Sequence, residues 1–430
     1  MSNNVINARP TKEFFIGMLT RDIPLDRSIL DLIDNSVDSA NEKRIKDPVV
    51  KLSLSNNEFK IEDNCGGVSL DVAKNYAFRF GRPKDREETP SSVGQFGVGM
   101  KRTLFKIGQK FQVISCHDNI CFRIFVDVKE WTRHDEWEFV FETINSGEAD
   151  YISSGHTKII VTDLYPEISE QLTQYSFINE LSKEVSIAHF KSINAGMKLY
   201  INEQLASTYE LKLISTDKIT PVKKIFDNNG VKTTIIAGVS ERKIKEGGWY
   251  VVCNGRLVVA AEQSKITGWK EDGIPQYHPD YAFFRGIVEM ESSDSSLLPW
   301  TTTKTGIDKD NKYYKAALYN MKMVAREILQ FLKERAKEDN NRREELVDET
   351  PLNDSVRVDS DTLVPISKIT FSDSFIRPLQ APLKEGPNLA NIQYKVSHHE
   401  LELVQKALGV ATAKDAGLQT FKYYFDYECK

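Results

Sequence analysis

The chain has 430 residues, with 57 Lys and Arg residues against 62 Asp and Glu residues and a formal net charge of -5. At roughly 150 residues per domain this length predicts two to three domains, and the near-neutral charge gives no global attraction to nucleic acid. A hydrophobic fraction of 40% excludes wholesale disorder, and no apolar run approaches the ~18 residues that a membrane span needs.

The first 200 residues alternate helical and strand patterns. Residues 26–45 predict an amphipathic helix, and KLSLSNNEFKIED predicts two strands joined by a Ser-Asn-Asn turn. A polar stretch over 79–92 leads into the glycine-rich GQFGVGMK, where a helix is expected to start between Val98 and Lys101. Strands are expected over 110–116, 120–128, 137–144, 157–164 and 198–202, with helical signal over 168–192.

The rest of the chain predicts a second mixed region and a looser C-terminus. A long helix is expected from Lys312 to Glu338, because apolar residues recur there at helical spacing. The polar tract over 338–355 is typical of a linker, and the last forty residues carry two short helix signals. We therefore predict three regions, 1–200, 201–345 and 346–430.

The cysteines, histidines and opening residues narrow the class of protein. The five Cys and seven His residues are scattered, and no Cys-x-x-Cys pair occurs, which argues against a structural zinc site and a disulfide framework. The opening MSNNVINARPTKEFF lacks the apolar core of a signal peptide. We expect a cytoplasmic protein.

The most informative segment is LDLIDNSVDSA (30–40). At helical spacing Asp31, Asp34, Asn35 and Asp38 fall within one narrow arc, opposite an apolar face. Three carboxylates held together are costly unless a cation or a hydrogen-bond network relieves them. This arc predicts a polar site, and a solvated surface face is the equally acceptable alternative.

Two glycine-containing boxes follow the acidic helix. Asp63 ends a strand and precedes Gly66 and Gly67, where a carboxylate can accept a hydrogen bond and glycine lets the backbone approach a flat ligand. Taken alone, this box is most often just a turn. In SVGQFGVGMK, bare amides at a helix N-terminus together with Lys101 predict an anion site. This box is neither a Walker A loop nor a Rossmann fingerprint.

The order of these boxes resembles that of the GHKL ATPase superfamily, which includes gyrase, the heat-shock chaperone ATPase, histidine kinases and MutL. The resemblance covers roughly residues 20–165, and AFRFGRPKD followed by GQFGVGMK is most similar to the MORC-type branch. It implies an α+β fold: a GHKL (Bergerat) α/β sandwich, then a gyrase-type transducer domain, and a small C-terminal extension.

The resemblance also assigns roles at the phosphate end of an ATP site. It implies that Asn35 coordinates Mg²⁺, with Asp38 among the nucleotide-binding residues of the same helix. Asp31 takes the place of the glutamate that acts as general base, and is one methylene shorter. The lid residues that wrap the triphosphate correspond to Gly94, Gly97, Gly99 and Lys101.

At the adenine end the resemblance matches Asp63 to the residue that reads the amino group, Gly67 to the glycine beside it, and Thr157 to the fourth box. WYVVCNGRLV is similar to a transducer strand and turn, although Asn254-Gly255 is also a good hairpin turn. Lys304, in the loop LPWTTTKTGIDKD, is then the candidate for the transducer lysine that reaches the γ-phosphate; a solvated loop lysine is the alternative.

The function implied is a slow, Mg-dependent ATPase that acts as a molecular switch, with ATP closing the lid and joining two protomers in a homodimer. DNA or an effector protein is the expected partner, in DNA handling or antiphage defence. The alternative is a nucleotide-gated binding or scaffold module with little or no turnover. A histidine kinase is disfavoured, since no His precedes His117.

Overall fold

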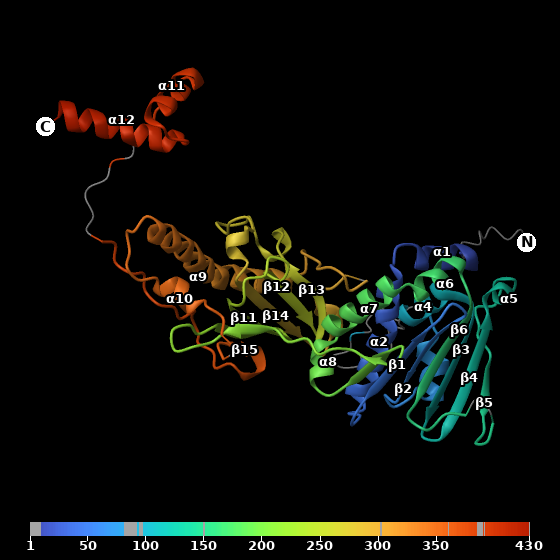
Figure 1. The fold of residues 1–430 in the computed structure, drawn as a ribbon. Coiled ribbons are helices and arrows are strands. Elements are labelled where there is room, and N and C mark those ends of the chain that lie inside the picture. Colours follow the sequence, from blue (N-terminus) through green and yellow to red (C-terminus); the bar gives the residue numbers. More distant parts are fainter. Residues whose placement is uncertain are drawn as a thin grey trace, which may run out of the picture. The chain divides into compact units, whose positions relative to one another are not determined.

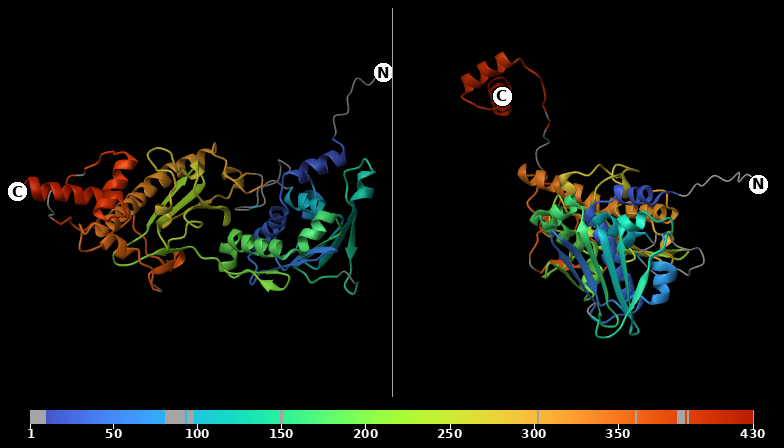
Figure 2. Two further views of the ribbon diagram at one scale, coloured as in Figure 1. Left: turned by 45° about the horizontal axis from the view of Figure 1, so that its top comes forward. Right: turned by 90° about the vertical axis from the view of Figure 1, so that its right-hand side faces the viewer.

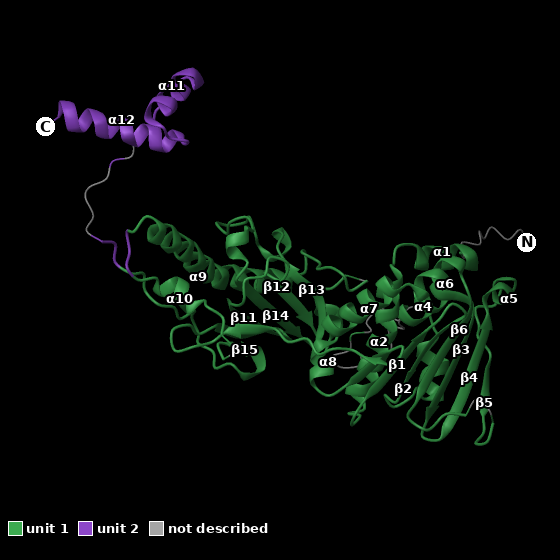
Figure 3. Cartoon of the chain, in the orientation of Figure 1, with its two compact units in different colours: residues 1–345, 349–381 green, residues 346–348, 382–430 purple. Residues whose placement is uncertain are grey.

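The computed structural model describes residues 10–80, 93, 98–148, 151–301, 303–359, 361–384, 390 and 392–429. The chain divides into two compact units, one of residues 1–345 with 349–381 and one of residues 346–348 with 382–430 (Figure 3). Helices and sheets both build the larger unit, which has an α+β fold. The three regions expected from the sequence stay a prediction. In the described part of the chain, no helix combines the length and the apolar character that crossing a bilayer requires.

The first sheet of the larger unit has eight strands in the order β5-β4-β3-β6-β2-β1-β7-β8 (Figure 1). Its strands are β1 (Val49–Leu54), β2 (Glu58–Asp63), β3 (Gly108–His117), β4 (Ile120–Asp127), β5 (Phe141–Ile144), β6 (Thr157–Leu164), β7 (Lys198–Ile201) and β8 (Gln204–Leu205). Among the described strands of this sheet, β1 and β7 pair in parallel and the other neighbours are antiparallel. Along β1, Val50, Leu52 and Leu54 are buried while Lys51 is exposed, so one face of the sheet carries the core.

Helices cover that apolar face. They are α1 (Lys12–Arg21), α2 (Leu25–Glu42), α3 (Leu70–Val72), α4 (Gly99–Ile107), α5 (Val128–Thr132), α6 (Pro166–Thr173), α7 (Tyr175–Ala188) and α8 (Phe190–Asn194), with a π-helical turn over Ala73–Ala77. Helix α2 buries Ile29, Leu30 and Ile33 against the sheet, as its amphipathic pattern predicts. Helix α4 starts at Gly99, within the expected interval.

The second sheet of the same unit has five strands in the order β10-β11-β14-β12-β13. They are β10 (Val222–Asn228), β11 (Val231–Val239), β12 (Gly248–Cys253), β13 (Arg256–Glu262) and β14 (Phe284–Glu291), and a separate pair joins β9 (Lys212–Ile214) to β15 (Leu363–Pro365). The long helix α9 (Lys312–Arg343) packs on this sheet through residues such as Ala317, Met321 and Ile328 (Figure 2). The hairpin around Asn254-Gly255 joins β12 to β13.

The prediction of a linker over 338–355 is wrong for most of these residues, which are helical. Helix α9 continues to Arg343, and α10 (Pro351–Ser355) forms a further helical turn. The buried Glu338 carboxylate accepts the backbone N–H groups of Leu352 and Asn353, which fixes α10 against α9. A polar tract therefore folds because one of its carboxylates caps a helix N-terminus.

Two more sequence predictions need correction. The strand expected over 137–144 is formed only by Phe141–Ile144, because Trp137 and Phe139 turn into an aromatic cluster around Phe80 and Trp131. No disulfide framework was expected, yet Cys116 and Cys121 form a disulfide. The register of the β3–β4 hairpin places these two residues directly opposite each other.

The smaller unit contains the two helices expected at the C-terminus, α11 (His398–Leu408) and α12 (Ala413–Glu428). Helix α11 begins with a capping box of Ser397 and Glu400. Aromatic side chains of α12 are exposed, including those of Tyr423 and Tyr424.

Candidate functional site

The acidic arc of α2 is not a solvated face. Asp31 and Asp34 are 4% and 0% exposed, so that alternative is wrong for both residues. Asn35, the next residue along, is exposed, and Asp38 is half-buried. The helix therefore presents two buried carboxylates and one accessible carboxamide within little more than one turn.

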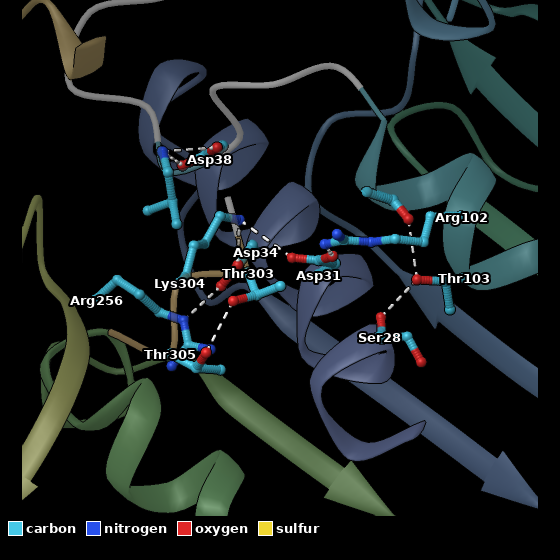
Figure 4. A network of polar contacts seen from close by, with 12 residues as sticks. Ser28, Asp31, Asp34, Asp38, Arg102, Thr103, Arg256, Thr303, Lys304 and Thr305 are labelled. Atoms are coloured by element: carbon cyan, nitrogen blue, oxygen red, sulfur yellow. Dashed lines mark hydrogen bonds and ion pairs between the residues drawn. The ribbon is translucent and has the colours of Figure 1, made fainter. Parts of the chain in front are cut away.

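Asp31 lies between helix α4 and the loop that carries Lys304 (Figure 4). One of its carboxylate oxygens accepts a hydrogen bond from the Arg102 guanidinium, and the other lies 3.4 Å from the Lys304 ammonium. Helix α4 approaches closely here, since a Cβ added to Gly99 would lie 3.2 Å from the Asp31 side chain. Glycine at this position lets the two helices meet.

Asp34 receives three basic groups from three elements. The Lys304 ammonium lies 2.6 Å from one carboxylate oxygen, and the Arg256 guanidinium of β13 lies 2.9 Å from the other. His189, at the junction of α7 and α8, lies 3.4 Å from that second oxygen. Burial alone would raise the pKa of Asp34, but Lys304, Arg256 and His189 outweigh it and hold this pKa at about 2.

The charges of this group do not cancel. Burial, reinforced by Arg256, lowers the pKa of His189 to about 3, so its imidazole is neutral at pH 7. Burial would lower the pKa of Lys304, but Asp34 and Asp31 outweigh it and raise this pKa. Three cations, Arg102, Arg256 and Lys304, thus face two carboxylates. This buried excess of one positive charge favours an anion at the site.

A second polar group lies at the ends of β2 and β6. Asp63 accepts hydrogen bonds from the Ser36 hydroxyl of α2 and the Cys65 backbone N–H, both at 2.8 Å. Burial raises the pKa of this carboxyl above its usual value. Thr157 pairs with Asp63 across the two strands, and its hydroxyl lies 2.9 Å from that of Ser115. Asp63 and Thr157 also help to line a cavity of about 480 Å³.

Gly67 packs beside this group in a conformation that favours glycine. Its φ is +62°, and an added Cβ would collide with the backbone carbonyl of Cys116. Lys43 donates to the carbonyls of Gly66 and Gly67, which fixes the turn to the end of α2. The sequence analysis did not single out Lys43. Its position directly after the acidic helix was the one sequence feature that could have drawn attention to it.

The structure describes some of the residues matched to the nucleotide lid and not others. Gly94 and Gly97 lie outside the described residues. Both carboxylate oxygens of Asp38 accept the backbone N–H of Val93, at 2.8 and 2.9 Å. Lys101 is buried and donates to the Ala77 carbonyl at 2.7 Å, and burial lowers the pKa of this amine to about 7. The structure therefore does not bring Lys101 to the carboxylates of α2.

The site residues fit a magnesium ion held by few protein ligands. Among the described residues, no cluster of three or more His, Cys, Asp or Glu side chains could hold a metal by itself. Asn35 is exposed beside the buried carboxylates, and its carboxamide oxygen is a hard donor of the type that Mg²⁺ prefers. Mg²⁺ usually combines one or two protein ligands with phosphate oxygens and water, which this arrangement allows.

Comparison with known proteins agrees with this geometry. Residues 23–157 match the family described as histidine kinase-, DNA gyrase B- and HSP90-like ATPases. The matched segment contains α2, the Asp63 box, Gly99 and Thr157, whereas His189, Arg256 and Lys304 lie outside it. None of the curated proteins searched matches the chain. The family match supports a GHKL-type, ATP-binding ATPase domain in this part of the molecule.

Proposed function

We propose that the protein is a Mg-dependent ATPase of the MORC-type branch, in which a transducer domain reads the nucleotide bound by the first sheet. One observation carries the proposal: Lys304 of the second region lies between Asp31 and Asp34 of the matched region, where buried positive charge exceeds negative charge. A phosphate group is the anion that an ATPase site would bring there.

Adenine recognition falls to the group around Asp63. An ionised or hydrogen-bonded carboxylate accepts from an exocyclic amino group, and Ser36 and Cys65 hold this one in a fixed orientation. Gly67 lacks a Cβ and so lets the backbone lie close to the base, and the Thr157 hydroxyl, paired with Ser115, would supply a second polar contact. Because these partners come from α2, β3 and β6, the base would meet a preformed surface.

Asn35 would hold the magnesium ion, with the bare N-terminus of α4 and Gly99 beside the phosphates. When bound, Mg²⁺ neutralises charge on the transferring phosphoryl group. Lys304 adds a preorganised cation, since its backbone and its two carboxylate partners fix its ammonium in place. Asp31 is the general base that would accept the proton of the attacking water.

The alternative proposal, a nucleotide-gated module with little turnover, rests on a specific contact. Arg102 donates a hydrogen bond to one oxygen of Asp31, and the Asp31 side chain is almost fully buried. The guanidinium occupies this carboxylate oxygen and so restricts its approach to a water molecule. Slow turnover is therefore part of the main proposal as well.

Homodimer formation on ATP binding, a DNA or effector partner, a role in DNA handling or antiphage defence, and a cytoplasmic location belong to the proposal through the resemblance alone. The smaller C-terminal unit, with its exposed Tyr423 and Tyr424, is the part of this chain that we propose as an extension for such contacts.

Phosphate release from Mg-ATP tests the function directly. The wild-type chain is expected to release phosphate slowly, and sedimentation with a non-hydrolysable analogue is expected to show a dimer that ADP does not produce. ATP binding without phosphate release would favour the nucleotide-gated module. No ATP binding by calorimetry would contradict both proposals.

A further inference from the structure

Asp34 occupies the junction between the two sheets of the larger unit. It is completely buried on α2, yet its carboxylate meets the Lys304 loop and, through Arg256, β13 (Figure 4). It also meets the α7–α8 junction through His189. Its two oxygens are divided between these partners. One takes Lys304, and the other takes Arg256 and His189.

The contacts to the second oxygen are electrostatic in character. Neither the Arg256 Nε–H nor the His189 ring nitrogen is aligned for a hydrogen bond with Asp34, although both lie within 3.4 Å. Lys304, by contrast, donates a hydrogen bond at 2.6 Å. Arg256 therefore keeps Asp34 ionised, and the ionised carboxylate orients Lys304 through a directed bond.

The loop around Lys304 is shaped for this contact. Its ends are joined by the Thr301 N–H donating to the Gly306 carbonyl, and the Lys304 N–H donates back to Thr301. Lys304 itself has a φ of +53°, in the left-handed region that few non-glycine residues adopt. The loop thus directs a single long side chain into the first sheet's helix layer, where Asp34 receives it.

We propose that Asp34 is a positioning residue that sets the Lys304 ammonium beside Asp31, and that it contacts neither the nucleotide nor the metal. The whole Asp34 side chain is buried, with one oxygen hydrogen-bonded to Lys304 and the other within 3.4 Å of Arg256 and His189, so protein groups surround both oxygens, whereas Asn35 is on the exposed side of the helix. The inference rests on the proposed function for the roles of Asp31 and Lys304. It goes beyond that function by assigning the remaining carboxylate of the arc.

A double-mutant cycle in urea unfolding tests the coupling without any need for turnover. Asp34→Asn leaves Arg256 and Lys304 less compensated, and is expected to raise the unfolding equilibrium constant roughly 100-fold or more. Combined with Lys304→Met, it should cost clearly less than it does in the wild-type chain, because no Lys304 ammonium is then left without its partner and only the contact with Arg256 is lost. If Asp34→Asn alone does not fold, a folded Asp34→Asn, Lys304→Met chain would likewise show that the two residues are coupled.

Lys191 and Glu289 supply the matched control. They form a 2.7 Å ion pair between α8 and β14, away from Asp31, and both are partly exposed. Lys191→Met and Glu289→Gln should each change stability by only a few fold. If the double variant raised the unfolding equilibrium constant by the product of the two single-variant factors, the two residues would act independently, and the proposal would be overturned.

The functional readout separates positioning from ligand binding. Asp34→Asn is expected to lower kcat while ADP affinity stays within about twofold, and to cause no further loss in a Lys304→Ala chain. A fall in ADP affinity, or an added loss on top of Lys304→Ala, would overturn it. If the wild-type chain hydrolyses no ATP, the proposed function fails, while the unfolding cycle still decides the role of Asp34.

Discussion

The Lys304 ammonium lies 2.6 Å from the Asp34 carboxylate, although the two residues are 270 positions apart in the chain. This ion pair joins the helix layer of the first sheet to a loop that precedes the long helix of the second. Both side chains are buried, so water and salt screen the pair much less than they screen a surface ion pair. Any change of charge near Asp31 is therefore felt directly by a residue of the other sheet.

Removal of Lys304 should silence the ATPase without abolishing nucleotide binding. Lys304→Ala is expected to lower phosphate release about ten- to a thousand-fold, the scale of losing one preorganised charge contact. ADP affinity should change little, because ADP lacks the γ-phosphate. Lys315→Ala, on an exposed lysine nearby in the chain, is the control. Normal turnover and ATP-dependent association of the Lys304 variant would remove it from the site.

Asp63→Asn should weaken adenine binding while preserving the fold. The amide can still accept from the Cys65 N–H and donate to Ser36, but its NH₂ group would meet the adenine amino group. One mispaired buried group costs about 1–3 kcal/mol, so ATP affinity should fall about tenfold or more. Calorimetric titration measures this. The control is Glu58→Gln, at the other end of β2 and outside the lining of the 480 Å³ cavity. Unchanged affinity would place adenine elsewhere.

Loss of Asn35 should act through magnesium. Asn35→Ala is expected to abolish measurable turnover and to weaken ATP binding when Mg²⁺ is present, with little effect when EDTA is present. Asn41→Ala, an exposed residue on the same helix, should behave as wild type. Equal ATP affinity of the Asn35 variant with and without Mg²⁺, both as in wild type, would show that this residue holds no ion.

Lengthening Asp31 tests whether the site is built around aspartate. Helix α4 approaches Asp31 at Gly99 and Arg102 holds one of its oxygens, so an added methylene would have to displace these neighbours, and overpacking costs roughly 1–3 kcal/mol. Asp31→Glu should therefore lower phosphate release about tenfold or more. Asp31→Asn should retain ADP binding and lose turnover. A rate for Asp31→Glu at or above wild type would show that the shorter side chain limits proton transfer.

Acid should destabilise the protein through His189 before Asp34 contributes. His189 has a pKa of about 3 in the folded chain, against about 6.5 when unfolded. Between these values the unfolded state binds the extra proton, so stability is lost as pH falls below about 6.5, by roughly 1.4 kcal/mol per pH unit. His189→Gln should flatten the unfolding free energy between pH 6.5 and pH 5. An unchanged slope would contradict the buried, neutral imidazole.

Local patterns in the sequence predict the parts of the site that lie on one element. The spacing of Asp31, Asp34 and Asn35 places them on one arc of α2, and GQFGVGMK marks the start of α4. The same periodicity does not tell a buried arc from an exposed one. That depends on cations from other elements, and none of them is near α2 in the chain.

Long-range partners account for what the sequence missed. Arg256 and His189 meet Asp34 only because the second sheet and the α7–α8 junction are folded against α2. Glu338 caps α10 across a turn that reads as a linker, and Cys116 meets Cys121 through strand register. Each contact depends on tertiary folding or strand register, which the local sequence around either residue does not reveal.

The left-handed backbone at Lys304 sets two opposing requirements on one position. Glycine or asparagine would adopt a φ of +53° with less strain, while lysine holds it at a cost of about 1 kcal/mol. Lysine at this position is favoured only if the length and charge of its side chain contribute more than the backbone strain costs. Lys304→Gly should then give a chain that folds at least as readily as Lys304→Ala and is equally inactive, which separates what the loop prefers from what the enzyme requires.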